Sequence, residues 1–149
     1  MRVLGLDLGA RRIGTALSDT DGKIAFPHGA IDRHNRKKDL ESLQELIRDE
    51  GVGHIVVGLP IHMDGRVGPE AQSARTFAQV LGEATGIPVD VLDERWTTQE
   101  AERALRESAP TRGRSRRREQ GRRERVDALA AALILRTFLE LRATEIGER

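Results

Sequence analysis

The chain contains no cysteine among its 149 residues. Disulfide bonds, thiolate nucleophiles and zinc sites built on sulfur are therefore excluded, and the composition fits a reducing compartment. No apolar run is long enough to span a bilayer, and the N-terminal residues enter a strand pattern without the layout of a signal peptide. We accordingly expect a cytoplasmic protein with no membrane partner.

Length and composition bound the number of domains. A chain of 149 residues has the usual size of one domain, and 38% of its residues are hydrophobic while 33% are charged. The sequence shows no internal repeat and no second unit. We therefore predict a single domain over residues 1–149, with a modest core and a heavily charged surface.

The net charge of +1 hides one strongly basic segment. Residues 112–125 contain eight arginines and two glutamates, a net charge of +6, which leaves −5 for the rest of the chain. The planar guanidinium group of arginine suits phosphate. The segment is either a solvated loop without a partner or a nucleic-acid contact, and we favour the second. The arginines predicted to make these contacts are Arg116, Arg117, Arg122 and Arg123.

The order of predicted elements indicates an α/β fold. Residues 2–8 and 13–18 predict two buried strands joined by a tight turn, and residues 23–26 predict a short third strand that Pro27 ends. The later pattern predicts, in order, a helix at 39–50, a strand at 54–58, a helix at 70–83, a strand at 89–92, a helix from 97 to about 107, an arginine-rich loop at 109–121 and a helix from 126 to about 142. An antiparallel meander followed by alternating helices and strands predicts a central mixed five-stranded sheet flanked by helices, the order of a ribonuclease H-like architecture.

Three acidic residues lie where carboxylates are rarely tolerated without a partner. Asp7 interrupts an apolar strand, Glu94 follows a strand, and Asp127 lies at the start of an apolar helix. Carboxylates at element ends can converge and hold Mg2+ or Mn2+. Two such ions can activate a water and stabilise the leaving oxygen of a phosphodiester. The pattern therefore predicts a metal-dependent nuclease in which all three acids are catalytic and metal-binding.

Each acid also has a purely structural explanation. Asp7 has an alternative as the partner of a nearby arginine. Glu94 has an alternative as a surface acid in a loop before a helix. Asp93 also competes with Glu94, and because neighbours along a strand point to opposite faces, only one of the two is expected in the site; we favour Glu94. A carboxylate in the first turn of a helix is stabilised by the helix dipole, so Asp127 has an alternative without any catalytic role.

Further arginines are predicted to contact the nucleic-acid backbone: Arg11, Arg12, Arg66 and Arg95. The first two lie one turn from Asp7 and have an alternative as its ion-pair partners. Arg66 lies in the loop 60–69, which is either a flap over the site or a simple surface connection. Arg95 either neutralises charge beside the metal ions or pairs with Asp93.

Four blocks of sequence, in order, resemble the YqgF/RuvX family. They are LGLDLGARRIGTA at 4–16, IVVGLP followed by MDG within 55–65, DERWTT at 93–98 and VDALAA at 126–131. Any one block is weak evidence, but the ordered set spans nearly the whole chain. Members of this family are described as Holliday junction resolvases or as pre-16S ribosomal RNA nucleases.

The resemblance implies a ribonuclease H-like fold, a cytoplasmic location and trimming of the 5′ end of pre-16S ribosomal RNA during ribosome biogenesis. It also implies that Asp7, Glu94 and Asp127 are the catalytic acids, and that small-subunit components of the ribosome are further partners. Trp96 stands where the family more often has leucine, and it is expected either in the core or stacked on a base. The arginine density of 112–125 is a second departure, which affects substrate preference rather than fold.

Other functions compete with this interpretation. A Holliday junction resolvase cutting four-way DNA would need two active sites and hence a homodimer, so the state of the protein, monomer or homodimer, stays open. A non-catalytic RNA-binding assembly factor is disfavoured because carboxylates near phosphates weaken binding. An actin-like ATPase or sugar kinase shares the Asp7-Leu8-Gly9 opening, but such proteins close two domains over ATP.

Overall fold

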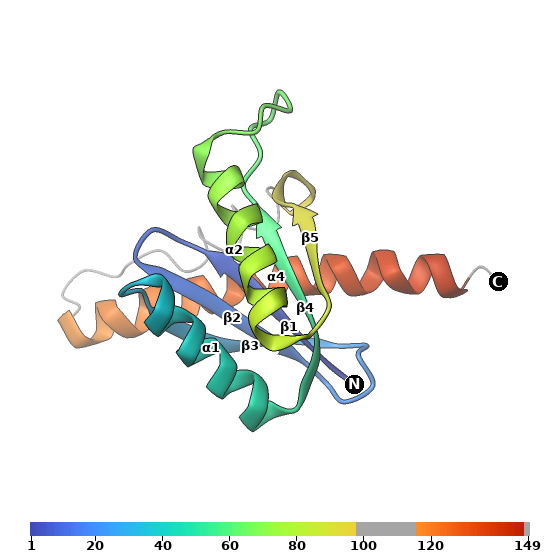
Figure 1. Ribbon diagram of the computed structural model, residues 1–149, viewed down its shortest axis with the longest axis horizontal. Coiled ribbons are helices and arrows are strands. Elements are labelled where there is room, and N and C mark those ends of the chain that lie inside the picture. Colours follow the sequence, from blue (N-terminus) through green and yellow to red (C-terminus); the bar gives the residue numbers. More distant parts are fainter. Residues whose placement is uncertain (98–115, 148–149) are drawn as a thin grey trace.

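The computed structural model describes residues 1–97 and 116–147. These ranges form one five-stranded sheet with helices on both faces (Figure 1). The strands are β1 (Arg2–Leu8), β2 (Arg12–Ser18), β3 (Ala25–Asp32), β4 (Val52–Leu59) and β5 (Val89–Asp93). The helices are α1 (Arg36–Glu50), α2 (Pro69–Thr85) and α4 (Arg116–Gly147), and a single 3-10 turn, η1 (Glu94–Trp96), follows β5.

The predicted mixed sheet is confirmed, with strand order β3-β2-β1-β4-β5. β2 pairs antiparallel with both β1 and β3, so the first three strands form the expected meander. β4 pairs parallel with β1, and β5 pairs parallel with β4. Because β1, β4 and β5 run in the same direction, their carboxyl ends meet at one edge of the sheet, where ligands bind in α/β folds.

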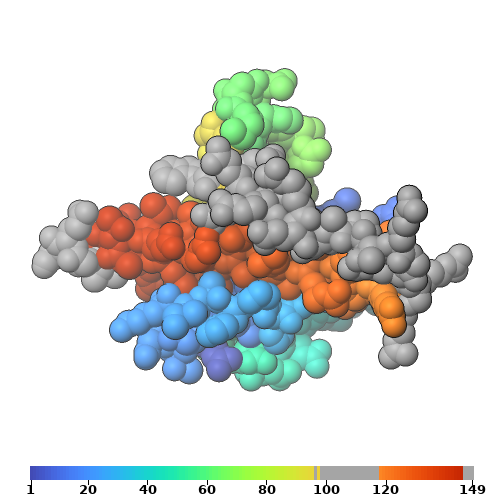
Figure 2. All heavy atoms as spheres, turned by 180° about the vertical axis from the view of Figure 1, so that it is seen from behind, coloured from blue at the N-terminus to red at the C-terminus, as the bar shows by residue number. Residues whose placement is uncertain are grey.

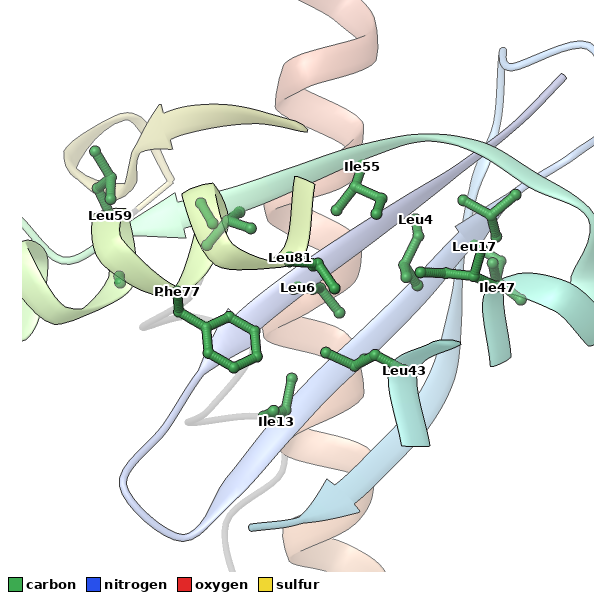
Figure 3. Packing of buried hydrophobic residues seen from close by; sticks show 14 residues of the cluster. Leu4, Leu6, Ile13, Leu17, Leu43, Ile47, Ile55, Leu59, Phe77 and Leu81 are labelled. Carbon is green, nitrogen blue, oxygen red and sulfur yellow. The ribbon is translucent and has the colours of Figure 1, made fainter. Parts of the chain in front are cut away.

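One face of the sheet packs against α1 and α2. Alternate residues of β1, Leu4 and Leu6, point to this face and are fully buried together with Ile55 of β4. Leu43 of α1 and Phe77 of α2 close over them (Figure 3). Each fully buried side chain of this size contributes roughly 1.5–3 kcal/mol to folding. This cluster therefore holds both helices to the sheet and leaves the opposite face for α4.

The opposite face of the sheet is covered by α4, which runs across the view in Figure 2 and contacts β3, β2, β1 and β4. Val3, Ala16 and Val56 of the sheet form a buried cluster with Ala131 and Leu135 of α4. A Cβ atom placed on Gly5 would lie 2.8 Å from the Cβ of Leu135, so the helix rests almost directly on the strand backbone. None of the helices in the described part of the chain has the length and apolar character needed to cross a membrane.

The start of α4 differs from the prediction. The helix begins at Arg116, not at 126, and continues to Gly147, not to about 142. The predicted loop is therefore wrong for residues 116–121, whereas its remainder, like the helix predicted at 97–107, falls largely outside the described residues. The first turns of α4 are polar on all sides and show no apolar period. They are supported by ion pairs from Arg122 and Arg123 to Glu119, three and four residues apart.

The third strand is also longer than predicted. Proline was expected to end it, but β3 runs through Pro27 to Asp32. β3 is an edge strand, and its pairing with β2 shifts register between Thr15 and Ala16, the latter opposite Pro27. An edge strand with a register irregularity tolerates proline because the missing N–H need not join a ladder.

The first helix begins earlier than its apolar period suggests. α1 starts at Arg36, not at Asp39, because Asn35 is its N-cap and accepts a hydrogen bond from the backbone N–H of Lys38 at 2.9 Å. Asp39 is buried and accepts hydrogen bonds from the backbone N–H of His34 and from the Arg33 side chain. The remaining predicted strands and the helix at 70–83 agree with the structure within two residues at each end.

Candidate active site

The three predicted acids lie on the α4 face of the sheet, near its carboxyl edge. Asp7 lies between Leu6 and Leu8, which pack toward α1 and α2, so the Asp7 side chain points to α4. Glu94 is the first residue after β5 and opens η1. Asp127 belongs to α4. All three are partly buried, which gives each carboxylate a reason to seek a partner.

Asp7 and Glu94 are in direct contact through a side-chain hydrogen bond. Burial is the largest cause that raises the pKa of Glu94, and the charge and hydrogen bond of Asp7 raise it further, to about 8. Burial also raises the pKa of Asp7, which the hydrogen bond from Glu94 lowers and the charge of Asp127 raises. The pKa values of both carboxyl groups are therefore raised, which favours one proton held between Glu94 and Asp7 at neutral pH.

Gly14 brings Asp127 to this pair. Gly14 is opposite Asp7 in the antiparallel pairing of β1 and β2, and a Cβ placed on it would lie 2.1 Å from the carbonyl oxygen of Asp127. The absent side chain therefore lets the α4 backbone lie against β2 at this point.

Asp127 is engaged by Arg12. The Nε atom of Arg12 donates a hydrogen bond to Oδ2 of Asp127 at 2.5 Å, and the two side chains are 19% and 27% exposed. The pair corrects two expectations. Arg12 does not pair with Asp7, and Asp127 lies well inside α4 rather than in its first turn, so the helix dipole does not explain an acid here.

Gly58 makes room for Glu94. A Cβ on Gly58 of β4 would lie 2.8 Å from Oε1 and 3.0 Å from Cγ of Glu94, and 2.6 Å from Cδ1 of Ile134 on α4. The Glu94 side chain therefore lies over the bare backbone of β4, between β5 and Asp7. Sequence reasoning did not assign Gly58 this part, although a glycine inside an apolar strand is itself a signal of close approach.

Asp93 and Glu94 are separated as the alternation along a strand requires. Asp93 accepts hydrogen bonds from the backbone N–H of Arg95 at 2.9 Å and from its Nε at 2.8 Å. These bonds hold the pKa of Asp93 below its ordinary value. Asp93 is thus paired with Arg95, and Glu94 is the neighbour that meets Asp7. Of the two roles expected for Arg95, a charge beside the metal ions or an ion pair with Asp93, the structure shows the ion pair.

The other predicted nucleic-acid contacts lie on the surface to different degrees. Arg66 is 74% exposed in the loop before α2 and pairs with Asp64 at 2.7 Å. Arg11 is exposed in the turn between β1 and β2. Arg122 and Arg123 project from the first half of α4, where both are near Glu119. Arg116 and Arg117 lie in the first turn of α4. Their side chains, like the side chain of Trp96, are not described by the structure.

The chemistry of the donor set fits a hard divalent cation. Two partly buried carboxyl groups share a proton, and a third lies close enough for its charge to raise the pKa of Asp7. Within residues 1–97 and 116–147, no three acidic, histidine or cysteine side chains are arranged tightly enough to hold a metal ion. In this structure the Asp127 carboxylate is bonded to Arg12. Oxygen donors of this kind suit Mg2+ and Mn2+, whose charge would replace that of the shared proton.

Comparison with known proteins decides the family. Residues 1–141 match the RuvX family, described as "Holliday junction resolvase". The chain is 48% identical over 140 residues to a protein of Anaeromyxobacter sp. (strain Fw109-5), and the aligned residues cover 94% of this chain and 97% of that protein. It is 45% identical over 140 residues to a protein of Syntrophomonas wolfei, covering 94% of each. Both relatives are named "Putative pre-16S rRNA nuclease".

The chain belongs to the RuvX family. It is thus a member of a family of nucleic-acid hydrolases, and the resemblance of the four sequence blocks is confirmed. The family description and the names of the relatives point to different substrates, a four-way DNA junction and a ribosomal RNA precursor. Membership in the RuvX family therefore gives the class of enzyme but leaves its substrate to be argued.

Solved structures confirm the ribonuclease H-like fold of this RuvX chain. "T. thermophilus RuvC in complex with Holliday junction substrate" matches with a TM-score of 0.60 and 16% identity, covering 97% of this chain and 96% of that one. The fowlpox virus resolvase in complex with Holliday junction DNA matches with a TM-score of 0.53 and 10% identity, covering 95% of this chain and 98% of that one. At these identities the likeness concerns the fold alone.

Proposed function

We propose that this RuvX protein is a divalent-metal-dependent nuclease that processes the 5′ end of pre-16S ribosomal RNA in the cytoplasm. The observation that carries the proposal is the contact between Asp7 and Glu94 at the carboxyl edge of the sheet, with Asp127 beside them. Burying two carboxyl groups in contact is energetically costly, and ligation of a metal ion accounts for their presence. The names of the curated relatives support ribosomal RNA as the substrate.

In the proposed mechanism Asp7, Glu94 and Asp127 would hold Mg2+ or Mn2+. When bound, such ions activate a water and stabilise the leaving oxygen of a phosphodiester. On binding of the ion, Glu94 would release to solvent the proton that it shares with Asp7, so that both groups would present full negative charge. Gly58 and Gly14 keep the three acids close by admitting the Glu94 side chain and the α4 backbone.

Nucleic acid is proposed to approach along α4 and the turn between β1 and β2. Arg11, Arg122 and Arg123 are partly or fully exposed there, and arginine binds backbone phosphates without reading sequence. Arg66 and Arg95 are proposed to contact the strand from the loop before α2 and from η1. Binding at the ribosomal precursor would bring small-subunit components into contact with the same surface.

The decisive experiment is cleavage by wild type and by Asp7→Asn. The variant keeps the shape of the side chain but removes the carboxylate, so we expect cleavage to fall at least about a thousandfold, or about 4 kcal/mol in the barrier. Because burial raises the pKa of Asp7, loss of its charge should leave the free energy of unfolding unchanged or higher. Single-turnover cleavage of a labelled pre-16S 5′ fragment with Mg2+ or Mn2+, together with urea unfolding, measures both.

A Holliday junction resolvase is the second candidate, and the RuvX family description favours it. Offering a labelled four-way DNA junction in the same assay separates the two. Paired symmetric cuts in the junction, with intact RNA, would replace the RNA proposal and require a homodimer. If Asp7→Asn cuts as fast as wild type, the acid site is wrong. If wild type binds RNA and DNA but cuts neither with any divalent metal, a non-catalytic assembly factor replaces both candidates.

A further inference from the structure

The ion pair between Arg12 and Asp127 connects residues that are 115 positions apart in the chain. Arg12 lies at the start of β2, and its Nε atom is 2.5 Å from Asp127 Oδ2. The pair occupies the carboxylate of the third acid of the site. Arg12 therefore competes for the oxygen that a divalent cation would need.

We propose that Arg12 is a counter-cation that holds Asp127 until a divalent ion binds, and that its guanidinium is then released to bind a phosphate of the nucleic acid. The inference rests on the proposed function, since it assumes that Asp7, Glu94 and Asp127 ligate the ion. It makes Arg12 a positioning residue for Asp127 and, once released, a contact for the substrate.

Charge explains the direction of the exchange. A divalent ion beside Asp7 and Glu94 attracts the Asp127 carboxylate more strongly than one guanidinium does, and it repels Arg12. Asp32 and Glu124 also act on the charge of Arg12, so the released guanidinium does not lose all of its anionic neighbours. Its remaining donors form a planar fork that matches phosphate.

A fixed structural ion pair is the competing explanation, and metal binding distinguishes the two. If Arg12 competes with the ion, Arg12→Gln should bind Mn2+ about tenfold more tightly than wild type, the order expected when one full charge is removed from beside a divalent cation. If the pair only orients Asp127 for the ion, the same variant should bind Mn2+ equally or more weakly. Isothermal titration of the protein with Mn2+, without nucleic acid, gives the dissociation constant directly.

Two further variants control for folding and for charge. Arg2 lies at the opposite end of β1 from the site and forms an ion pair of similar exposure with Glu50, at 2.8 Å. Arg2→Gln breaks this pair and should leave Mn2+ affinity unchanged. Arg12→Lys keeps the charge beside Asp127, so its Mn2+ affinity should stay near that of wild type. Circular dichroism and thermal melting establish that each variant is folded before titration. An affinity of Arg12→Lys equal to that of Arg12→Gln would overturn the charge argument.

Release of Arg12 has a second, separate readout in nucleic-acid binding. Fluorescence anisotropy with a labelled pre-16S 5′ fragment, in Ca2+ or in EDTA, measures how much a divalent ion strengthens binding. We expect a clear gain in wild type and in Arg2→Gln, and a gain reduced severalfold in Arg12→Gln. Equal gains in all three proteins would overturn the release of Arg12 to phosphate. The intact length of the fragment is checked by gel after each titration.

The outcomes keep this inference separate from the proposed function. If wild type binds no Mn2+ at millimolar concentration, the metal-dependent nuclease itself is wrong and the role of Arg12 falls with it. If wild type binds Mn2+ and Arg12→Gln binds it no more tightly, the counter-cation role alone is overturned and the nuclease proposal stands.

Discussion

At the scale of single residues, the chemistry of the site depends on which partners its acids have. Burial makes a charged Asp7 or Glu94 costly, and the two groups reduce this cost by sharing one proton. Asp127 reduces its own cost by pairing with Arg12. Neighbouring acids thus differ in protonation because their surroundings differ, as Asp93 shows by keeping its charge beside Arg95.

Gly58→Ala tests whether bare backbone positions Glu94. The added Cβ would lie 2.8 Å from Oε1 of Glu94 and 2.6 Å from Ile134, distances that require one or both side chains to move. We expect kcat for cleavage to fall at least about tenfold, with KM for the nucleic acid changed less than twofold, because most of the arginines proposed to contact phosphate lie on other elements than Gly58 and Glu94.

The control for this variant is Gly82→Ala in α2. A Cβ on Gly82 would meet Val89 at 3.5 Å, an ordinary contact, and alanine favours the helix. Its cleavage rate should match that of wild type. Full activity of Gly58→Ala would show that Glu94 need not lie over β4 for turnover.

At the scale of elements, the placement of α4 decides which residues can form a site. Its backbone lies on β1 at Gly5 and on β2 at Gly14, where no side chain intervenes. The apolar pattern of its later turns predicted burial correctly but gave no information on the polar first turns. Those turns are helical because they continue a helix already anchored on the sheet, a case in which tertiary packing overrides local pattern.

Gly14→Ala should displace α4 from β2. The new Cβ would lie 2.1 Å from the carbonyl oxygen of Asp127 and 2.7 Å from its carbonyl carbon, and backbone cannot rotate away as a side chain can. We expect the free energy of unfolding to fall by about 2–3 kcal/mol, at the upper end of the usual cost of overpacking. Urea unfolding monitored by circular dichroism measures the change.

Gly29→Ala on the neighbouring strand β3 is the matched substitution. Its Cβ would meet only Thr15 Oγ1, at 4.0 Å, so the cost should stay below about 1 kcal/mol. Replacing glycine by alanine also restricts the unfolded chain, which by itself favours folding and acts alike on both variants. Equal losses of stability would therefore contradict a specific clash between the Gly14→Ala side chain and α4.

At the scale of the whole molecule, the shared proton links stability to pH. The pKa of Glu94 is raised in the folded protein from 4.5 to about 8, so the folded state binds more protons than the unfolded state between these values. The stabilisation from this proton is complete below about pH 4.5 and is lost as pH rises through about 8. In EDTA, wild type should therefore lose about 2 kcal/mol relative to Glu94→Gln between pH 5 and pH 8.5, after allowance for solvent screening.

The comparison uses Glu94→Gln because titrating groups away from the site are common to both proteins and cancel in the difference. Asp7 contacts Glu94 and does not cancel, so the difference reports the titration of the Asp7–Glu94 pair. Urea unfolding at several pH values provides the free energies. Addition of Mg2+ at pH 8.5 should raise the stability of wild type more than that of the variant, by the mass action of a ligand that binds only the folded state. A difference between the two proteins that does not depend on pH would contradict the raised pKa.

Much of the fold was predictable because local pattern records burial. Alternation along β1 and the apolar runs of β4 and β5 located the strands, and their order predicted the mixed sheet that the structure confirms. The errors lie at the helix starts of α1 and α4 and at Pro27 in β3. At each of these, a cap, an anchored helix or an edge position supplied stability that hydrophobic periodicity does not register.

For the site, the sequence alone was enough to single out Asp7, Glu94 and Asp127, since an acid in an apolar element is conspicuous wherever it folds. Tertiary structure decided which groups the three contact. In the folded protein Glu94 is hydrogen-bonded to Asp7, and Asp127 is paired with Arg12. Gly14 leaves room for the α4 backbone, and Gly58 leaves room for the Glu94 side chain. The physical reason is that burial is a property of one position, whereas contacts across 115 residues depend on which faces of the sheet and helix meet.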